Sequence, residues 1–335
     1  MILIVSDLTT RHPIKMKVTN QVTEPNRSRL FFQEKISLVF LVVATVWMIN
    51  CNHSPFLSSR SGSEGVVPSK PRRIISLSPS VTEILEGIGA FEQVVAVSDY
   101  CSYPAGVEEL PRLGGWQNAS IEKIASLRPD LIIMSEIQAP FIDDQLQALR
   151  FKVLVVDSKS LSDIFSTIEL IGQAVGREPE AEKLLIQVQS QLDSIALRTE
   201  GLSKPRVLCV VDRVPGTLRG LYVATKGSYL TQLIEVAGGL SIVPSATSVY
   251  AKISKEAIVT FNPEVIIDMV QGTEGSFKED VSSIWNVFNH LHAVREGRLY
   301  AIREMFVIHP SQFVVKTAEL FAKLIHPEEF TLDAN

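Results

Sequence analysis

The 335-residue sequence has few cysteines and no excess of positive charge. Three cysteines are too few for a disulfide scaffold. With 32 basic and 37 acidic residues the net charge is −5, so a nucleic acid is not an expected partner. The 46% of hydrophobic residues is enough for a packed core and excludes disorder as the main state. A chain of 335 residues predicts about two domains.

Common catalytic and nucleotide-binding motifs are also missing. The sequence contains no GxSxG, no P-loop, no HExxH and no GxGxxG after a strand. Residues 72–160 contain no histidine, which excludes a zinc or manganese site that shares several imidazoles between two lobes. His290 and His292 form one candidate surface metal pair. The sequence otherwise predicts no metal site and no catalytic residue.

The apolar run at residues 36–49 has fourteen residues, fewer than the about 20 that a membrane-spanning helix needs. This length is typical of the hydrophobic region of an export signal, and basic residues precede it as in such signals. The basic residues are Arg27, Arg29 and Lys35. Residues 1–50 carry a net charge of +3 and the rest of the chain −8, a distribution that exported proteins tend to show. We predict that residues 1–50 are a signal peptide region that starts at Met1 or Met16.

Cys51 follows the apolar run and is preceded by Asn50. This layout resembles a bacterial lipoprotein signal, in which the cysteine is lipidated, although that signal prefers Gly or Ala at the position of Asn50. A cleaved soluble signal and an uncleaved anchor are the other two interpretations. Residues 51–71 are rich in Ser, Gly and Pro and predict a flexible tether. We expect a periplasmic or extracytoplasmic protein that a lipid on Cys51 holds at the membrane.

Short apolar runs alternate with helical patterns over residues 72–160, which predicts an N-terminal lobe with a parallel α/β layer. The expected strands are Arg73–Leu77, Val94–Ser98, Leu131–Met134 and Val153–Val156. Ser80 and Glu83 have the spacing of a capping box, so a helix is predicted to begin at Ser80 and to end at Gly89.

Residues 161–204 are predicted to form linking helices. Apolar residues recur at helical spacing from Leu161 to Ile171, and Gly176 interrupts the pattern. Pro179 restarts a helix of about 21 residues, which is about 31 Å long. Residues 205–330 then resume the alternation as a C-terminal lobe.

An internal repeat relates the two lobes. SIEKIASLRPDLIIM from Ser120 matches SKEAIVTFNPEVIID from Ser254 at an offset of 134 residues, which pairs Glu122 with Glu256. A second match relates the segments that begin at Val81 and Leu230. The predicted fold class is therefore α/β, with two Rossmann-like α/β lobes, a cleft between them and a long rigid α-helix that joins them.

Aromatic residues follow several predicted strands, in the loops at the carboxyl ends where open α/β sheets bind ligands. Such side chains favour a large, flat, partly apolar ligand. The candidate ligand-binding residues are Tyr100, Tyr103, Trp116, Tyr222, Tyr250, Phe306 and His309. For each aromatic residue alone, an anchor packed on its own lobe is the other interpretation. For His309 the alternatives are a hydrogen-bonded histidine and, opposite Tyr100 or Tyr103, a ligand of haem iron.

Cys101 and Cys209 lie in different predicted lobes. Cys209 stands inside an apolar strand and is predicted to be a buried thiol. A bridge between the two cysteines, which would clamp the cleft, is the alternative that we consider least favoured.

Five motifs carry a family resemblance: IISLSPSVTEIL (74–85), VAVSDYCSYP (95–104), GGWQNASIEKI (114–124), RPDLII (128–133) and ISKEAI (253–258). With them, the chain from about Arg72 to Phe330 resembles the class III substrate-binding proteins of bacterial ABC importers for cobalamin, ferric siderophores and haem. Within that family it is most similar to the periplasmic cobalamin-binding proteins.

The resemblance implies a corrinoid receptor. Tyr100 or Tyr103, together with Trp116, match aromatic residues that stack on the corrin ring, whereas Tyr250 stands where cobalamin-binding proteins often carry tryptophan. Another family tryptophan is replaced by Ser135-Glu136. The ligand implied is a cobalt corrinoid, with haem or a ferric siderophore as alternatives, and no resident cofactor is expected.

The resemblance also implies partners. Glu122 and Glu256 match the two glutamates that dock onto arginines of the membrane permease, which works with its ATPase. Helix-dipole stabilisation is the other role of these two residues.

The chain is expected to be a monomer and not an enzyme. Arg213 and Arg219 would favour a siderophore if they line the cleft, and a metal-chelatase-like enzyme or an adhesion lipoprotein are alternatives of another class.

Overall fold

The computed structural model describes residues 70–330, apart from residue 270, residues 273–274 and residues 277–279. The chain divides into two compact units, residues 1–66 and residues 67–335, and the fold below is that of the second unit. The predicted signal peptide, Cys51 and most of the predicted tether lie outside the described residues. Among the described helices, none combines the length and the apolar character that crossing a bilayer requires.

The first lobe is built on a four-stranded parallel sheet in the order β2-β1-β3-β4. Every predicted strand is confirmed within one or two residues at its ends. The strands are β1 Ile74–Ser76, β2 Val94–Val97, β3 Leu131–Ser135 and β4 Val153–Val156. The helices of this lobe are α2 Pro79–Gly87, α3 Ile121–Leu127 and α4 Ala139–Ala148, the last of which the sequence patterns did not predict.

The start of α2 differs from the prediction. Ser78 is the N-cap, and Pro79 occupies the first turn, where its missing N–H is not needed. The capping box between Ser80 and Glu83 is therefore wrong. The Ser80 hydroxyl bonds to that of Ser78 instead, and the Glu83 carboxylate points out of the first lobe altogether.

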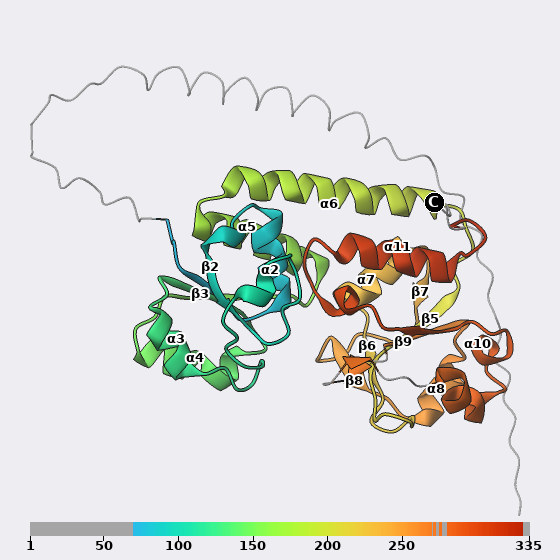
Figure 1. Ribbon diagram of the computed structural model, residues 1–335. Helices are drawn as coiled ribbons and strands as arrows, with labels where there is room; N and C mark the ends of the chain where they lie inside the picture. The colour runs from blue at the N-terminus through green and yellow to red at the C-terminus, as the bar shows by residue number, and fades with distance from the viewer. Residues whose placement is uncertain (1–69, 270, 273–274, 277–279, 331–335) are drawn as a thin grey trace, which may run out of the picture. The chain divides into compact units, whose positions relative to one another are not determined.

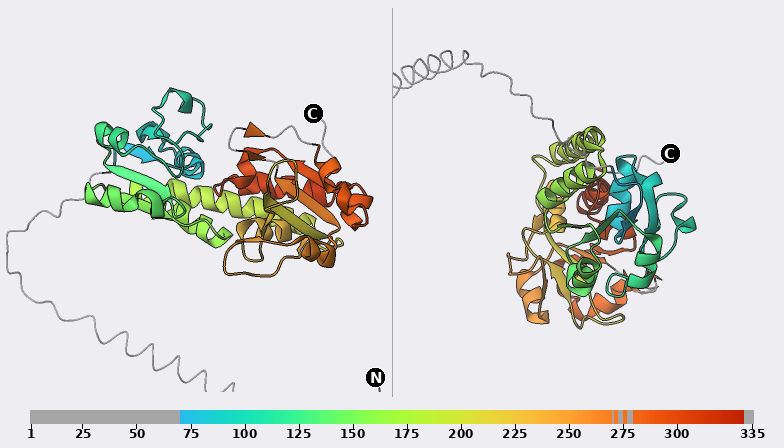
Figure 2. Two further views of the ribbon diagram at one scale, coloured as in Figure 1. Left: turned by 90° about the horizontal axis from the view of Figure 1, so that it is seen from below. Right: turned by 90° about the vertical axis from the view of Figure 1, so that its left-hand side faces the viewer.

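Two helices follow the first sheet in the chain. α5 Leu161–Val175 begins with a capping box between Ser160 and Asp163. It ends at Gly176, which adopts the left-handed conformation at φ 69°. α6 Glu178–Arg198 has the predicted length of 21 residues. It contacts α5 and also α7 Tyr229–Val236 and α11 Val314–Ile325 of the second lobe (Figures 1 and 2).

The second lobe holds a mixed sheet in the order β12-β9-β5-β6-β8, with β7 paired to β5. β5, β9 and β12 are parallel, and β6 and β8 add antiparallel strands at one side. The strands are β5 Arg206–Asp212, β6 Tyr222–Ala224, β7 Leu240–Ser241, β8 Tyr250–Lys252, β9 Val265–Met269 and β12 Leu299–Ile302. A short hairpin joins β10 Gln271–Gly272 and β11 Gly275–Ser276. The remaining helices are α8 Lys255–Phe261, α9 Val281–Trp285 and α10 His292–Arg295.

The internal repeat is visible in the helices. α3 and α8 each have seven residues and begin at a serine N-cap, Ser120 and Ser254. Each ends at a residue with positive φ, Arg128 and Asn262, which stand at the same offset as the two serines. This helix therefore begins and ends in the same way in the two lobes.

A single buried apolar cluster extends through both lobes. It includes Ile84 of the first lobe, Ile168 and Leu192 of the linking helices, and Phe321 of the second lobe. Because apolar burial stabilises by about 25 cal/mol per Å², a core shared across α5 and α6 resists separation of the lobes.

The close packing of α5 on α6 generates a stability prediction. A Cβ added to Gly172 would lie 2.5 Å from the Cβ of Ala181. Gly172→Ala should therefore lower the free energy of unfolding by about 1–3 kcal/mol through overpacking. Urea denaturation measures the change. The adjacent exposed Gln173→Ala is the control, and equal stability of both variants would contradict the packing described.

Candidate functional site

Large apolar side chains are exposed along the carboxyl ends of the strands in both lobes. Ten such side chains, each 36–58% exposed, lie in the loops, strand ends or first helical turns at this edge. They are Tyr100, Tyr103, Trp116, Ile137, Phe141 and Val155 in the first lobe and Val214, Tyr222, Met305 and Ile308 in the second. Exposed apolar groups gathered in this way indicate a binding surface, because water solvates them poorly.

The first-lobe loop after β2 is tied to the turn that carries Trp116. The backbone N–H of Asp99 donates to Gly114 O (3.0 Å), and the Asp99 carboxylate accepts from the Gly114 N–H (3.0 Å). The Arg112 guanidinium donates to the carbonyl oxygens of Ser98, Cys101 and Val107 at 2.6–3.2 Å. These bonds hold Tyr100 and Trp116 on neighbouring segments.

Tyr100 lies over a glycine. A Cβ added to Gly115 would meet the Tyr100 hydroxyl at 3.1 Å, so a side chain here would crowd the tyrosine in its present position. Next to it, the Trp116 ring meets Phe141 of α4 edge-on, with centroids 5.4 Å apart and planes at 90°. Phe141 was not among the sequence candidates, since the patterns did not predict α4.

Tyr103 contacts the other lobe. Its ring stands edge-on to Phe313, with centroids 5.2 Å apart. Burial, together with the carboxylates of Glu86 and Glu83, raises the pKa of Tyr103. The phenolate form of Tyr103 is therefore disfavoured.

The second-lobe candidates divide into exposed and packed side chains. Tyr222 at the start of β6 is exposed, whereas Phe306 and Tyr250 are partly buried and pack on the shared core. Tyr250 lies on β8 rather than in a loop, and its hydroxyl shares a hydrogen bond with Tyr229. Burial raises the pKa of Tyr250. Ligand contact by these three residues stays a prediction.

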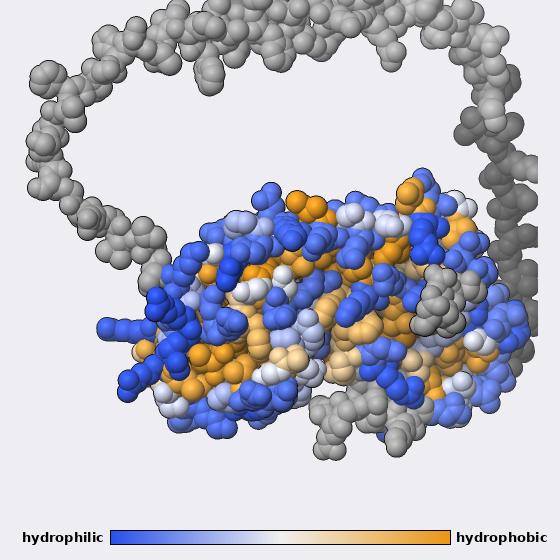
Figure 3. Space-filling model, turned by 45° about the horizontal axis from the view of Figure 1, so that its top comes forward, coloured by the Kyte–Doolittle hydropathy of each residue, from blue (hydrophilic) through white to orange (hydrophobic). Residues whose placement is uncertain are grey.

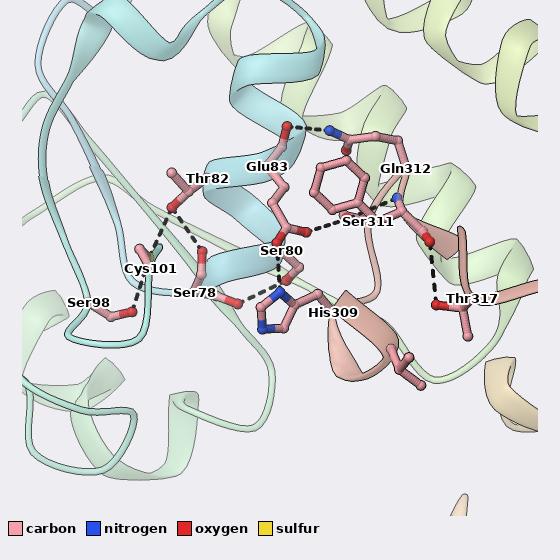
Figure 4. A network of polar contacts seen from close by, with 12 residues as sticks. Ser78, Ser80, Thr82, Glu83, Ser98, Cys101, His309, Ser311, Gln312 and Thr317 are labelled. Carbon is pink, nitrogen blue, oxygen red and sulfur yellow. Dashed lines mark hydrogen bonds and ion pairs between the residues drawn. The ribbon is translucent and has the colours of Figure 1, made fainter. Parts of the chain in front are cut away.

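A buried carboxylate joins the lobes (Figure 4). The Glu83 carboxylate of α2 forms two hydrogen bonds to the second lobe. One is with His309 Nδ1 at 2.6 Å, and in the other it accepts from the Ser311 hydroxyl at 2.5 Å. Gln312 Nε2 donates to the backbone oxygen of Glu83 at 2.7 Å. Glu83 is 3% exposed and His309 8% exposed. The Nδ1 atom of His309 is thus engaged by protein, which matches the hydrogen-bonded interpretation of this residue.

A second polar contact between the lobes involves the segment that leads into α5. The backbone N–H of Tyr229 donates to Lys159 O at 2.8 Å, and the Leu161 N–H donates to Gln232 Oε1 at 2.7 Å. Within the second lobe, Tyr229 also donates its hydroxyl to Val307 O. The bonds to Lys159 and from Leu161, together with the Glu83 contacts, fix the second lobe against the first at two places.

The predicted cationic and metal-binding candidates are placed as follows. Arg213 forms a buried ion pair with Asp268 (Nε to Oδ2, 2.9 Å), which also accepts from Trp285 Nε1. Arg219 is exposed. Among the described residues, no group of three or more His, Cys, Asp or Glu side chains is arranged to hold a metal ion, and His290 packs on Phe288.

Cys101 and Cys209 are both buried and free, so the bridge between them is not formed. Burial raises the pKa of the Cys209 thiol to about 12 and also raises that of Cys101. Both thiols are therefore held in their unreactive protonated form.

The docking candidates lie at equivalent positions. Glu122 and Glu256 are exposed in the first turns of α3 and α8. Hydrogen bonds from its own backbone N–H and from Ser254 lower the pKa of Glu256, so this carboxylate stays charged at neutral pH.

A cavity of about 440 Å³ lies away from the apolar edge, near the carboxyl end of α6. Its lining includes Asp193, Glu200, Lys204 and Glu235. It shares no residue with the candidate site.

Comparison with known proteins assigns the family. The model of the periplasmic binding protein family matches residues 74–305. The chain belongs to this family. An ABC transporter substrate-binding lipoprotein of Bacillus subtilis, YvrC, is 27% identical over 82% of this chain and 86% of its own length. The vitamin B12-binding protein of Yersinia pestis is 27% identical over 64% of this chain and 74% of its own length.

Solved structures agree with the fold. A possible iron-binding, periplasmic solute-binding protein from Staphylococcus epidermidis has a TM-score of 0.67 at 26% identity, over 77% of this chain and 99% of that one. The periplasmic heme-binding protein RhuT of Roseiflexus has a TM-score of 0.66 at 23% identity, over 77% and 99%. This protein is thus a substrate-binding protein of the kind that serves ABC transporters, and not an enzyme.

The Glu83 contact in this binding protein generates a second prediction. Glu83→Ala leaves two buried donors, on His309 and Ser311, without an acceptor. Each unsatisfied donor costs roughly 1–3 kcal/mol, so the free energy of unfolding should fall by that amount at least. Chemical denaturation measures it. The control is Glu86→Ala, because Glu86 lies on the same helix but takes no part in this contact. It should lower the free energy of unfolding much less. A similar decrease in the two variants would show that the Glu83 contact does not stabilise the fold.

Proposed function

We propose that this protein captures a corrinoid between its two lobes and delivers it to an ABC importer. The observation that carries the proposal is the gathering of exposed apolar side chains at the carboxyl ends of the strands of both sheets. Rings such as Trp116 and Phe141 bury much area with little loss of side-chain entropy. They suit a broad, flat ring system with an apolar face. Binding of vitamin B12 by the Yersinia relative supports the same ligand class.

Three placements favour a corrinoid over haem as cargo. His309 bonds through Nδ1 to Glu83, so this nitrogen is not free to ligate haem iron. The raised pKa of Tyr103 opposes the phenolate that would ligate ferric iron. Arg213, which could pair with an anionic group, is engaged by Asp268. Tyr100 is then the residue through which haem binding would proceed, and haem or a ferric siderophore is the second candidate.

The proposal includes export and anchoring. The protein acts outside the cytoplasm as a monomer, held by a lipid on Cys51. Its partners are the permease, which Glu122 and Glu256 contact, and the ATPase that powers uptake. Support comes from the B. subtilis relative, which is a substrate-binding lipoprotein, and from the equivalent exposure of the two glutamates.

Titration with cyanocobalamin tests the ligand. Quenching of tryptophan fluorescence should saturate in the submicromolar range, a strength that a few buried aromatic contacts can supply. Trp116→Ala should weaken binding about 30-fold or more, because buried aromatic anchors dominate binding energies.

The matched control is Leu197→Ala, which truncates an exposed apolar side chain of α6 away from the site; it should bind as the parent does. Absence of cobalamin binding, with a Soret band for hemin that disappears in Tyr100→Phe, would replace the corrinoid by haem.

Charge reversal tests the docking surface. Glu122→Arg with Glu256→Arg should abolish cobalamin uptake in cells, because two attractive contacts become repulsive. Binding of cyanocobalamin by the purified variant should be unchanged. Reversal of two other exposed glutamates, Glu169→Arg in α5 with Glu200→Arg in the turn after α6, is the control. Loss of ligand binding in the docking variant, or normal uptake, would reject this role.

A further inference from the structure

The amino ends of the first-lobe strands form an edge rich in basic residues. β1 pairs with β3 (Ile74 with Leu131) and β3 with β4 (Ile132 with Val153), so the residues before these strands lie side by side. Exposed basic side chains precede the strands or end the helices at this level. They are Arg72, Arg73, Arg128, Arg150 and Lys152, and we call them the basic edge.

Few of these charges are compensated. The Asp130 carboxylate accepts from the backbone N–H groups of Arg72 and Arg73 at 2.8 and 2.9 Å, and the Arg73 guanidinium donates to Leu127 O. Within the described part of the chain, the side chains of Arg72, Arg128, Arg150 and Lys152 form no hydrogen bond or ion pair. The basic edge therefore presents four uncompensated positive charges to solvent.

Two of the arginines occupy backbone positions that favour glycine. Arg128 has φ 47° and Arg150 has φ 60°, in the left-handed region that costs an L-residue free energy. The repeat-equivalent of Arg128 is Asn262, with φ 38°. Since asparagine is the residue that tolerates this conformation best after glycine, the backbone alone does not require arginine at position 128.

The equivalent edge of the second lobe is different. Arg206 there repeats the contacts of Arg73, bonding through its N–H to a carboxylate, Glu264, and through its guanidinium to Asn262 O. Arg206 also pairs with Glu264 and Arg295 with Glu296. Two arginines of this region are thus paired with carboxylates, whereas no side chain of the basic edge forms an ion pair among the described residues, so the surplus on the first lobe is not a requirement of the architecture.

The chain enters the described part of the molecule at the basic edge, directly before Arg72. Cys51, the predicted lipid site, lies nineteen residues before Lys70. The predicted tether from Cys51 therefore joins the folded unit at the basic edge.

We propose that the basic edge binds the anionic phospholipid surface to which the protein is anchored. Phosphate groups complement its uncompensated guanidinium and ammonium groups, and Leu149 beside Arg150, 52% exposed, supplies an apolar contact. The most hydrophilic side chains of the view in Figure 3 gather at the end that holds this lobe. The proposal rests on the proposed export and anchoring, but not on the identity of the ligand.

Sedimentation with lipid vesicles tests the proposal, using residues 67–335, the compact unit with its own core. The protein should bind vesicles with about 30% phosphatidylglycerol but not pure phosphatidylcholine, and high salt should release it. Arg128→Glu with Lys152→Glu should weaken binding at least about 25-fold, since each basic residue at an anionic surface strengthens binding about fivefold.

The control, Lys204→Glu with Lys323→Glu, makes the same change in net charge on exposed lysines outside the first lobe. It should bind as the parent does, and both variants should titrate normally with cyanocobalamin. Equal weakening in both variants would assign the effect to net charge. Equal binding to neutral vesicles, or none to anionic vesicles, would overturn the proposal and leave an acidic protein as the partner of this edge. The cyanocobalamin titration separates these failures from a failure of the proposed function.

Discussion

The arrangement of this protein depends on a carboxylate removed from water. Glu83 is contributed by the first lobe, but the groups that satisfy its oxygens, His309 Nδ1 and the Ser311 hydroxyl, belong to the second. Burying a carboxylate without hydrogen-bond donors is unfavourable in free energy. Any movement that separates the lobes at this point would therefore raise the free energy of the protein. The shared apolar core along α5 and α6 acts in the same direction. The two lobes are thus held by polar and apolar contacts, and separating the lobes would break both kinds at once.

Fixed lobes have a consequence for recognition. A receptor that closes by a large hinge motion spends part of its binding energy on the conformational change, whereas lobes that are already joined present a preformed surface. The contact between Tyr103 and Phe313 places an aromatic pair at the junction of the two lobes, next to the exposed side chains of the carboxyl edge. In the function proposed here, lobes joined in this way would keep Glu122 and Glu256 at a constant separation for docking onto the permease.

The local sequence predicted the elements well, because strands, capping serines and glycines act over a few residues. The repeat predicted that Glu122 and Glu256 are equivalent, and both do lie in the first turn of matching helices. Contacts between distant segments could not be predicted. The Ser80–Glu83 spacing was assigned to a capping box because its true partner, His309, is 226 residues away. Phe141 was missed because α4 has only ten residues and no side-chain N-cap bond marks its start, and only the fold brings its ring to Trp116.

In the function proposed here, charge and apolarity are separated by the ends of the strands. The carboxyl ends carry the exposed rings and take the ligand, the tips of α3 and α8 carry the docking glutamates, and the amino ends of the first sheet carry the basic edge. A net charge of −5 conceals this division, since acidic and basic groups nearly cancel over the whole chain. The repeated parts of the two lobes have the same backbone conformation, as Arg128 and Asn262 show. The backbone therefore does not determine which of the two lobes carries extra charge at such a position. The differences between the duplicated lobes are therefore more informative about partners than the features that the lobes share.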